Sequence, residues 1–269
     1  MLTAYFDESE IFSEIDMLFL CGWIASVSEW QQFEFDWRLL LAKYDVPYLH
    51  MKEFVHSNGP FAKWKGKEGT RRKFISDAAE IVRSNTQYGF SCCVSKQIFE
   101  KVGEVYELQN YFPSPYAFAG RTCAAMAELW AQRHGCKSSE VEYVFEDSNR
   151  DKAGLLRAMT EIRLPMPSPI FKPGRDSKPS SRWPEGRKGL VQLQAADYLA
   201  YEFGKFAKDF RQIETGKKRM RASLGVLPKE KIKWHFLQAQ HIALICRGLK
   251  IPRKEVVHSN HENAKGQTA

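Results

Sequence analysis

The sequence predicts one α/β domain, covering about residues 1–250, with a mixed β-sheet flanked by helices. The first 25 residues have the pattern of an antiparallel hairpin, whereas short apolar strands alternate with helices after residue 140. Hairpin strands pair antiparallel and strand–helix–strand units pair parallel, so the sheet should be mixed. A chain of 269 residues, of which 43% are hydrophobic, is compatible with one core that carries insertions.

The hairpin is followed by a segment, about 28–84, that we interpret as a helical and loop insertion beside the sheet. Leu2–Phe6 alternates in polarity, and the apolar run Leu18–Ile24 follows a polar bend. Ser28–Lys43 has large apolar residues at helical spacing, with Ser28 as the candidate N-cap. Residues 46–67 contain Pro and Gly turns and predict loops, and Thr70–Ser84 predicts a second helix.

The rest of the chain predicts alternating strands and helices. Strands are expected at Thr86–Val94, Val141–Phe145 and Ile170–Lys172, and helices at Pro115–His134, from a capping box of Ser148 and Asp151 to about Glu161, and at Leu190–Phe210. Six prolines make Leu164–Gly189 mainly a loop. Residues 251–269 are polar and predict a flexible tail.

Composition indicates a reduced, water-facing protein. The longest apolar run is too short to cross a bilayer and follows acidic residues, so we expect neither a membrane span nor a signal peptide. The six cysteines lack the spacing of a disulfide framework or zinc ribbon, which favours a cytoplasmic location. A formal charge of +8 favours polyanionic partners, although solubility alone explains it equally well.

Two acidic residues follow predicted strands. Asp7 ends the first strand, on the face that it shares with Thr3 and Tyr5. Asp147 comes just after the strand Val141–Phe145, and in a mixed sheet two such strand ends can be neighbours. The alternative for Asp147 is that it only begins the next helix.

A third acid, Asp197, lies on an apolar helix stripe. It shares that stripe with Leu193 and Tyr201, at spacings of four residues. A buried carboxylate needs a Lys or Arg partner, a proton or a cation, so a structural salt bridge is the alternative to a metal site. Three acids from two strand ends and a late helix are suited to hold Mg²⁺ or Mn²⁺ for phosphodiester hydrolysis.

Four short motifs, spread over about residues 2–205, resemble the domain of unknown function 3800 family. They are Tyr5-Phe6-Asp7-Glu8-Ser9, Tyr48-Leu49-His50-Met51-Lys52, Phe145-Glu146-Asp147-Ser148 and Leu193-Gln194-Ala195-Ala196-Asp197-Tyr198-Leu199-Ala200. The resemblance implies a ribonuclease H-like fold. It also implies that Asp7, Asp147 and Asp197 are the acids of the first strand, the fourth strand and the last helix.

That superfamily normally supplies a fourth acid, for which Glu8, Glu53 and Glu128 are the candidates. Glu8 should face away from Asp7 if the strand continues, and Glu128 is expected to face solvent on its helix. Glu53 lies near His50 in a loop that can fold over the site. His50 is either a ligand or phosphate-positioning residue, or an ordinary loop histidine.

Positive charge is concentrated in three segments, Lys63–Lys73, Lys172–Lys188 and Lys205–Lys233. The candidate nucleic-acid contacts are Lys217, Lys218, Arg219, Arg221, Arg182 and Lys188. Trp64 and Trp183 are candidate platforms for unpaired bases. The alternatives are that the charges form solvated faces and that the tryptophans pack in the core.

These observations predict a metal-dependent nuclease that acts on DNA or RNA. There is no phosphate-binding Gly-rich loop, no Gly-x-Ser-x-Gly motif and no paired histidine spacing. Two alternatives stay open, a non-catalytic nucleic-acid or protein-binding module of the same fold and a small-molecule phosphohydrolase. The sequence does not determine the oligomeric state.

Overall fold

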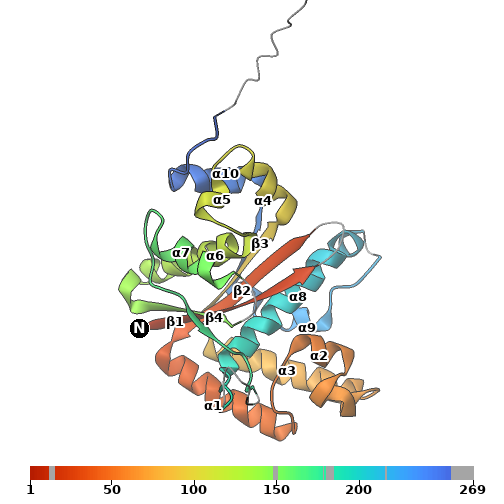
Figure 1. Cartoon of the computed structure of the whole chain (residues 1–269). Coiled ribbons are helices and arrows are strands. Elements are labelled where there is room, and N and C mark those ends of the chain that lie inside the picture. Colours follow the sequence, from red (N-terminus) through yellow and green to blue (C-terminus); the bar gives the residue numbers. More distant parts are fainter. Residues whose placement is uncertain (12–15, 148–150, 178, 180–184, 216, 256–269) are drawn as a thin grey trace, which may run out of the picture.

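The computed structural model describes residues 1–11, 16–147, 151–177, 179, 185–215 and 217–255. The described strands form one sheet in the order β5-β4-β1-β2-β3-β6 (Figure 1). β1 (Leu2–Ile11) and β2 (Met17–Ser26) form the predicted hairpin, and β3 (Tyr88–Ser95) pairs antiparallel with β2. β4 (Val141–Glu146) runs parallel to β1, and β5 (Ile170–Lys172) runs parallel to β4. The predicted α/β class with a mixed sheet is confirmed.

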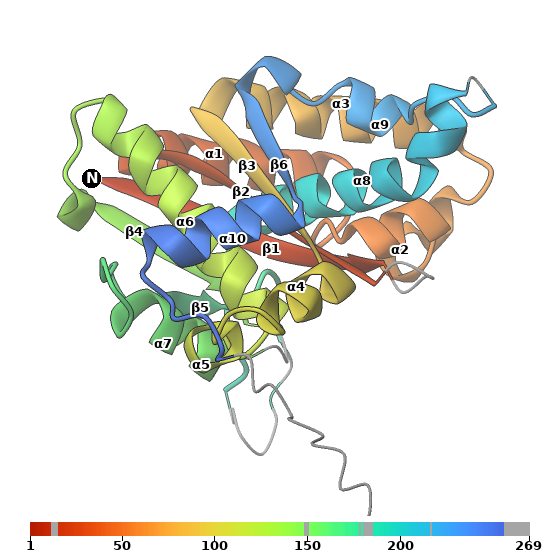
Figure 2. The ribbon, with the colours of Figure 1, turned by 90° about the horizontal axis from the view of Figure 1, so that it is seen from above.

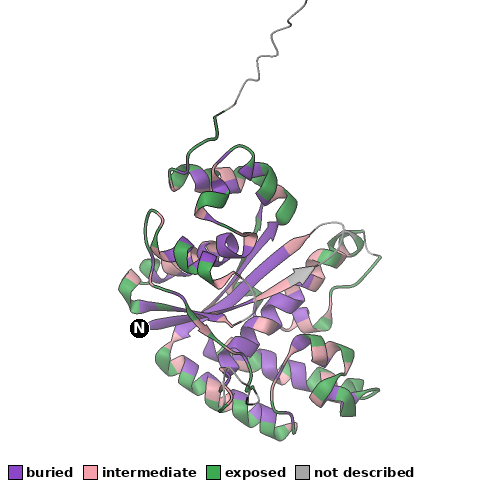
Figure 3. Cartoon of the chain, in the orientation of Figure 1, coloured by how far each residue is buried: buried purple, intermediate pink, exposed green. Residues whose placement is uncertain are grey.

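Helices cover both faces of this sheet (Figure 2). One face carries α1 (Val27–Lys43), α3 (Glu68–Asn85) and α8 (Val191–Glu214), and the other carries α4 (Lys96–Gly103), α6 (Pro115–Arg133), α7 (Lys152–Thr160) and α10 (Ala239–Gly248). Burial follows the strands and the helix faces turned toward them (Figure 3). On β1 the side chain of Phe6 enters the core under α6, so the alternating residues Tyr5 and Asp7 face α8.

The predicted insertion lies between β2 and β3. It consists of α1, α2 (Met51–His56), η1 (Gly59–Trp64) and α3, and both α1 and α2 contact α8. The N-cap of α1 is Ser26 and not Ser28, because the Ser26 side chain accepts a hydrogen bond from the Glu29 backbone N–H in a capping box. The insertion thus holds the segment before α2 against α8.

The chain after α8 adds elements that the sequence analysis did not anticipate. α9 (Ala222–Gly225) and η3 (Lys229–Lys231) lead to β6 (Ile232–Leu237), which pairs parallel with β3, and α10 follows. On the other side of the sheet, α5 (Leu108–Tyr111) follows α4, and η2 (Ser138–Glu140) precedes β4. β6 makes β3 an inner strand and is itself an edge of the sheet.

Two boundaries differ in detail from the expectation. The N-cap of α7 is Asp151, whose side chain accepts a hydrogen bond from the Gly154 backbone N–H, and Ser148 lies outside the described residues. The expected tail begins with hydrogen-bonded residues, since Pro252 accepts from Glu107 and Lys254 donates to Val105. Residues 256–269 lie outside the described part of the chain. No helix in the described segments has the length and apolar character needed to span a membrane.

Candidate active site at the ends of β1 and β4

Asp7 lies within β1 and does not end the strand as predicted, because the pairing with β2 continues to Ile11. It is buried, with 4% of its surface exposed. Its carboxylate Oδ1 accepts a hydrogen bond of 2.7 Å from the backbone N–H of Glu8. Burial, together with the nearby carboxyl groups of Glu146 and Glu8, raises the pKa of Asp7 well above its ordinary value. Asp7 therefore faces other carboxyl groups on the buried face of the sheet.

The acid beside Asp7 is Glu146 at the end of β4. Phe6 and Phe145 are partners in the parallel register, and their rings stack with centroids 5.0 Å apart. The next residues of the two strands therefore turn to the opposite face together. Glu146 raises the pKa of Asp7 both by its charge and by side-chain hydrogen bonding, which places the two carboxyl groups close together.

Asp147, the acid predicted for this position, is directed to the other face of the sheet. Its carboxylate accepts hydrogen bonds from the Lys152 ammonium and the Arg187 guanidinium. Burial opposes ionisation of Asp147, but these two cations outweigh it and lower its pKa. The structure therefore gives Asp147 a structural ion pair and places Glu146 where the fourth-strand acid was expected.

Asp197 projects from α8 toward the pair Asp7–Glu146. Its Oδ2 accepts a hydrogen bond of 2.6 Å from the backbone N–H of Met51, at the start of α2. Burial and the carboxylate of Glu146 raise the pKa of Asp197 to about 7, although the Met51 hydrogen bond acts in the opposite direction. The hydrogen bonds that Asp7 and Asp197 accept in the described part of the chain come from backbone N–H groups, not from Lys or Arg.

A second group of side chains lies next to these acids. Glu53 accepts hydrogen bonds from the Tyr48 hydroxyl at 2.9 Å and from Arg175 Nη1 at 3.1 Å. Burial alone would raise the pKa of Glu53, but Tyr48 and Arg175 lower it. His50 Nδ1 is 3.5 Å from Glu53 Oε1. Burial and the charge of Arg175 lower the pKa of His50, so its imidazole is neutral at pH 7.

Gln194 fixes the two loops that carry this second group. Its side-chain oxygen accepts hydrogen bonds from Trp37 Nε1 at 2.9 Å and from the Leu49 backbone N–H at 2.8 Å. Its amide nitrogen donates to the Gly174 carbonyl oxygen at 2.9 Å. A Cβ added at Gly174 would come within 3.0 Å of Glu146 Oε1, so this loop approaches the acids closely. Gln194 therefore positions His50 and Arg175 through their neighbours in the chain.

The remaining fourth-acid candidates lie at different distances from this site. Glu8 is an electrostatic neighbour of Asp7 but pairs in register with Leu20, which belongs to the core on the opposite face. Glu128 lies on α6, where its charge acts on Arg121 and Tyr143, so it is not part of the cluster. Glu53 is close enough for its charge to act on Asp197.

The predicted nucleic-acid contacts divide into three groups. Arg221 donates two hydrogen bonds, of 2.9 and 3.1 Å, to the fully buried Glu202, which gives it a structural role. Lys218 pairs with Asp209 at 2.6 Å. Lys217, Arg219 and Lys188 are exposed. Arg182 and Trp183 lie outside the described residues.

Trp64 is not a base platform. It is 4% exposed and packs edge-on or tilted against four other rings, those of Tyr44, Phe54, Phe61 and Phe74. These rings form the core of the insertion, so the alternative that this tryptophan packs in the core is correct.

The carboxyl groups of this site decide whether it fits a divalent cation. In the described ranges of the chain, no group of three or more His, Cys, Asp or Glu side chains is arranged to hold a metal ion. The donor types nevertheless suit Mg²⁺ or Mn²⁺, which prefer carboxylate oxygens. The neighbouring carboxyl groups that raise the pKa of Asp7 concentrate negative charge, which a bound cation would compensate.

Comparisons of the chain with models of known protein families, with curated proteins and with solved structures find no match.

Proposed function

We propose that this protein is a metal-dependent nuclease with a ribonuclease H-like fold, in which Asp7, Glu146 and Asp197 hold Mg²⁺ or Mn²⁺. The observation that carries the proposal is the close approach of two carboxyl groups on the neighbouring strands β1 and β4, with Asp197 beside them. Structural acids are normally paired with Lys or Arg, as Asp147 is in this chain. Asp7 on the first strand and Asp197 on α8 are acids that the resemblance to the domain of unknown function 3800 family implies, whereas Glu146 takes the place of its neighbour Asp147.

The chain's own residues account for the other requirements of phosphodiester hydrolysis. Water adds its oxygen to phosphorus, the phosphorus–oxygen bond to the leaving group breaks, and one proton passes from the water side to the leaving oxygen. A bound divalent cation would lower the pKa of water and stabilise charge on the phosphate oxygens. Neutral His50 is a group that can accept a proton, and Arg175 supplies positive charge next to it. Glu53 holds Arg175 in place.

A nucleic-acid substrate is favoured over a small phosphorylated molecule by the charge of the chain. Residues 205–233 contain ten Lys or Arg and three Asp or Glu. A field of this sign attracts the phosphate backbone, and the affinity should fall steeply with salt.

A non-catalytic binding module of the same fold is the second candidate. It is favoured by the hydrogen bond that Asp197 accepts from Met51 and by the raised pKa of Asp7, because a protonated carboxyl group needs no cation.

The decisive experiment compares Glu146→Gln with Asp147→Asn. Labelled single- and double-stranded DNA and RNA are incubated with purified protein and Mn²⁺. We expect Glu146→Gln, Asp7→Asn and Asp197→Asn to abolish cleavage, whereas Asp147→Asn retains a measurable rate. A thermal-shift titration with Mg²⁺ should stabilise the wild type and not Glu146→Gln. Cleavage that is undiminished in Glu146→Gln would refute the nuclease assignment, and binding without cleavage by the wild type would favour the module.

A further inference from the structure

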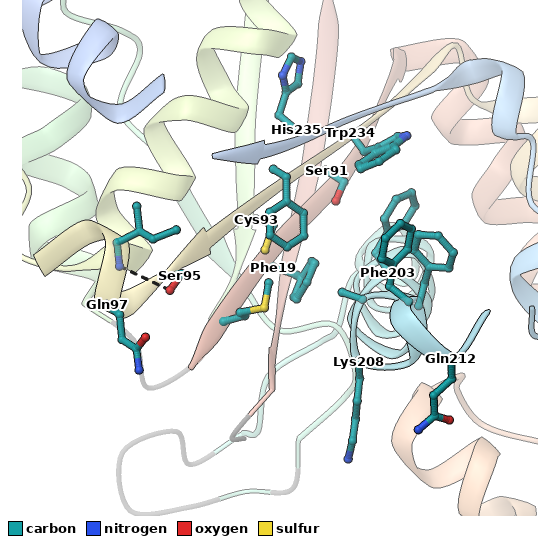
Figure 4. Close-up of a pocket in the computed structure, with 16 residues that line it drawn as sticks. Phe19, Ser91, Cys93, Ser95, Gln97, Phe203, Lys208, Gln212, Trp234 and His235 are labelled. Carbon is teal, nitrogen blue, oxygen red and sulfur yellow. Dashed lines mark hydrogen bonds between the residues drawn. The ribbon is translucent and has the colours of Figure 1, made fainter. Parts of the chain in front are cut away.

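An open groove lined by aromatic rings lies on the same sheet face as α8. It has a volume of about 870 Å³ and is formed by β2, β3, β6 and the second half of α8 (Figure 4). We call it the aromatic groove and define it by Phe19, Phe203, Phe206, Phe210, Trp234 and Phe236.

Three of these rings are exposed to an extent that core packing does not explain. Trp234 is 55% exposed, Phe236 40% and Phe210 43%. The register of β6 explains where the rings of Trp234 and Phe236 lie, because Phe236 pairs with Cys93, which belongs to the core under α8. Trp234 and Phe236 therefore point to the α8 side of the sheet, at an edge that no further described strand extends. Figure 4 shows Phe19, Phe203 and Trp234 around one opening.

The charge around the groove is positive. Lys208 is among the described residues that line it, and none of those lining residues is Asp or Glu. Ten of the protein's Lys and Arg residues fall within 205–233, the segment that runs along and beyond the groove. An apolar, aromatic surface within a basic surround is complementary to unpaired bases on a phosphate backbone.

We infer that the aromatic groove binds unpaired bases of a single-stranded nucleic acid. This inference rests on the proposed function, because it makes a single strand part of the nuclease's substrate. The groove extends along Phe203–Phe210, about 10 Å of helix, which is enough for two or three stacked bases. It lies on the opposite flank of α8 from Asp197, because Phe203, Phe206 and Phe210 are rotated from Asp197 by roughly 180–240° around the helix. The groove therefore holds a part of the strand that is remote from the bond to be cut.

A second copy of the chain is a weaker fit to the same surface. Two copies that met through β6 would bring two basic segments together, and Lys233 on the edge strand disfavours pairing with another strand. An apolar peptide would pack against the aromatic rings but would not be attracted by the positive charge. Both occupants are tested below.

Binding is measured by fluorescence anisotropy of a short labelled oligothymidylate and of a blunt duplex of equal length, in EDTA so that cleavage does not interfere. The wild type should bind the single strand at least tenfold more tightly. Trp234→Ala/Phe236→Ala should lose about tenfold in affinity for each ring that stacks on a base, and the duplex should be little affected. Trp234→Phe should retain most of the affinity. The matched control is Phe35→Ala, which removes an exposed ring (61%) on α1, outside the groove.

The possible outcomes separate the groove from the active site. Equal single-strand affinity in the double variant and the wild type would overturn the inference, even if the wild type cleaves with Mn²⁺. A selective loss in the double variant would support the groove, even if no substrate is cleaved. If size-exclusion chromatography shows a dimer that the double variant disrupts while oligonucleotide binding is unchanged, the groove is an interface between copies and the inference fails. Circular dichroism of each variant excludes unfolding as the cause.

Discussion

The carboxylate of Asp197 should make the stability of the protein depend on pH, and the uncharged amide of Asn should remove the contribution of this residue. Burial and the carboxylate of Glu146 raise the pKa of Asp197 from 3.8 to about 7. In the unfolded chain this group has its ordinary pKa. Between about pH 4 and pH 7 the folded state therefore keeps a proton that the unfolded state releases, so the free energy of unfolding falls as the pH rises through this window.

The size of the effect follows from the difference in pKa. A pKa that differs by about three between folded and unfolded states corresponds to about 4 kcal/mol, of which roughly 2–3 kcal/mol is lost between pH 5 and pH 8. Asp197 is only partly buried, and solvent reduces this value, so we expect a loss of about 1–2 kcal/mol. Asp197→Asn should lack this loss, because its side-chain oxygen can still accept the Met51 hydrogen bond without carrying a charge.

Urea unfolding followed by circular dichroism at pH 5 and pH 8, in EDTA, measures the effect. The control is Asp147→Asn, because its ion pairs lower the pKa of Asp147 and keep it ionised at both pH values. That variant should lose stability by a similar amount at both. If Asp197→Asn is destabilised relative to the wild type by the same amount at pH 8 and at pH 5, the native carboxylate is ionised at both pH values and its charge is compensated. That result would refute the reasoning.

Three further predictions concern the surroundings of the site. Gln194→Ala should lower the free energy of unfolding by about 2–4 kcal/mol, because three buried hydrogen bonds are lost; a urea midpoint equal to that of the wild type would contradict this. Arg221→Ala should cost about 3–5 kcal/mol by leaving Glu202 buried without its partner, and adding Glu202→Gln should recover part of the loss in the same assay. Replacing Lys217, Lys218 and Arg219 by Gln should reduce the slope of log affinity against log salt by about two rather than three, since Lys218 already pairs with Asp209. An unchanged slope in anisotropy titrations would remove this segment from the nucleic-acid contacts.

Local patterns were sufficient for the hairpin, α1, α3, α6 and α8, because each presents a continuous apolar face to one core. The pattern of β6 was also present, since Ile232, Trp234 and Phe236 alternate with Lys233 and His235. Its parallel pairing with β3 is a contact between distant segments, and nothing in either sequence specifies it. The roles of Arg175 and Gln194 were missed for the same reason, because both act on residues more than a hundred positions away.

The choice between Glu146 and Asp147 depends on the alternation of side chains along two parallel strands. Each strand carries an aromatic residue followed by two acids, Phe6-Asp7-Glu8 on β1 and Phe145-Glu146-Asp147 at the end of β4. The motifs alone do not distinguish adjacent acids. Once the two phenylalanines are paired in register, the first acid of each strand must face α8 and the second must face away. The alternation that places Glu146 beside Asp7 also directs Asp147 toward Lys152 and Arg187. Two adjacent residues of the chain therefore contribute to the candidate site and to a structural ion pair, respectively.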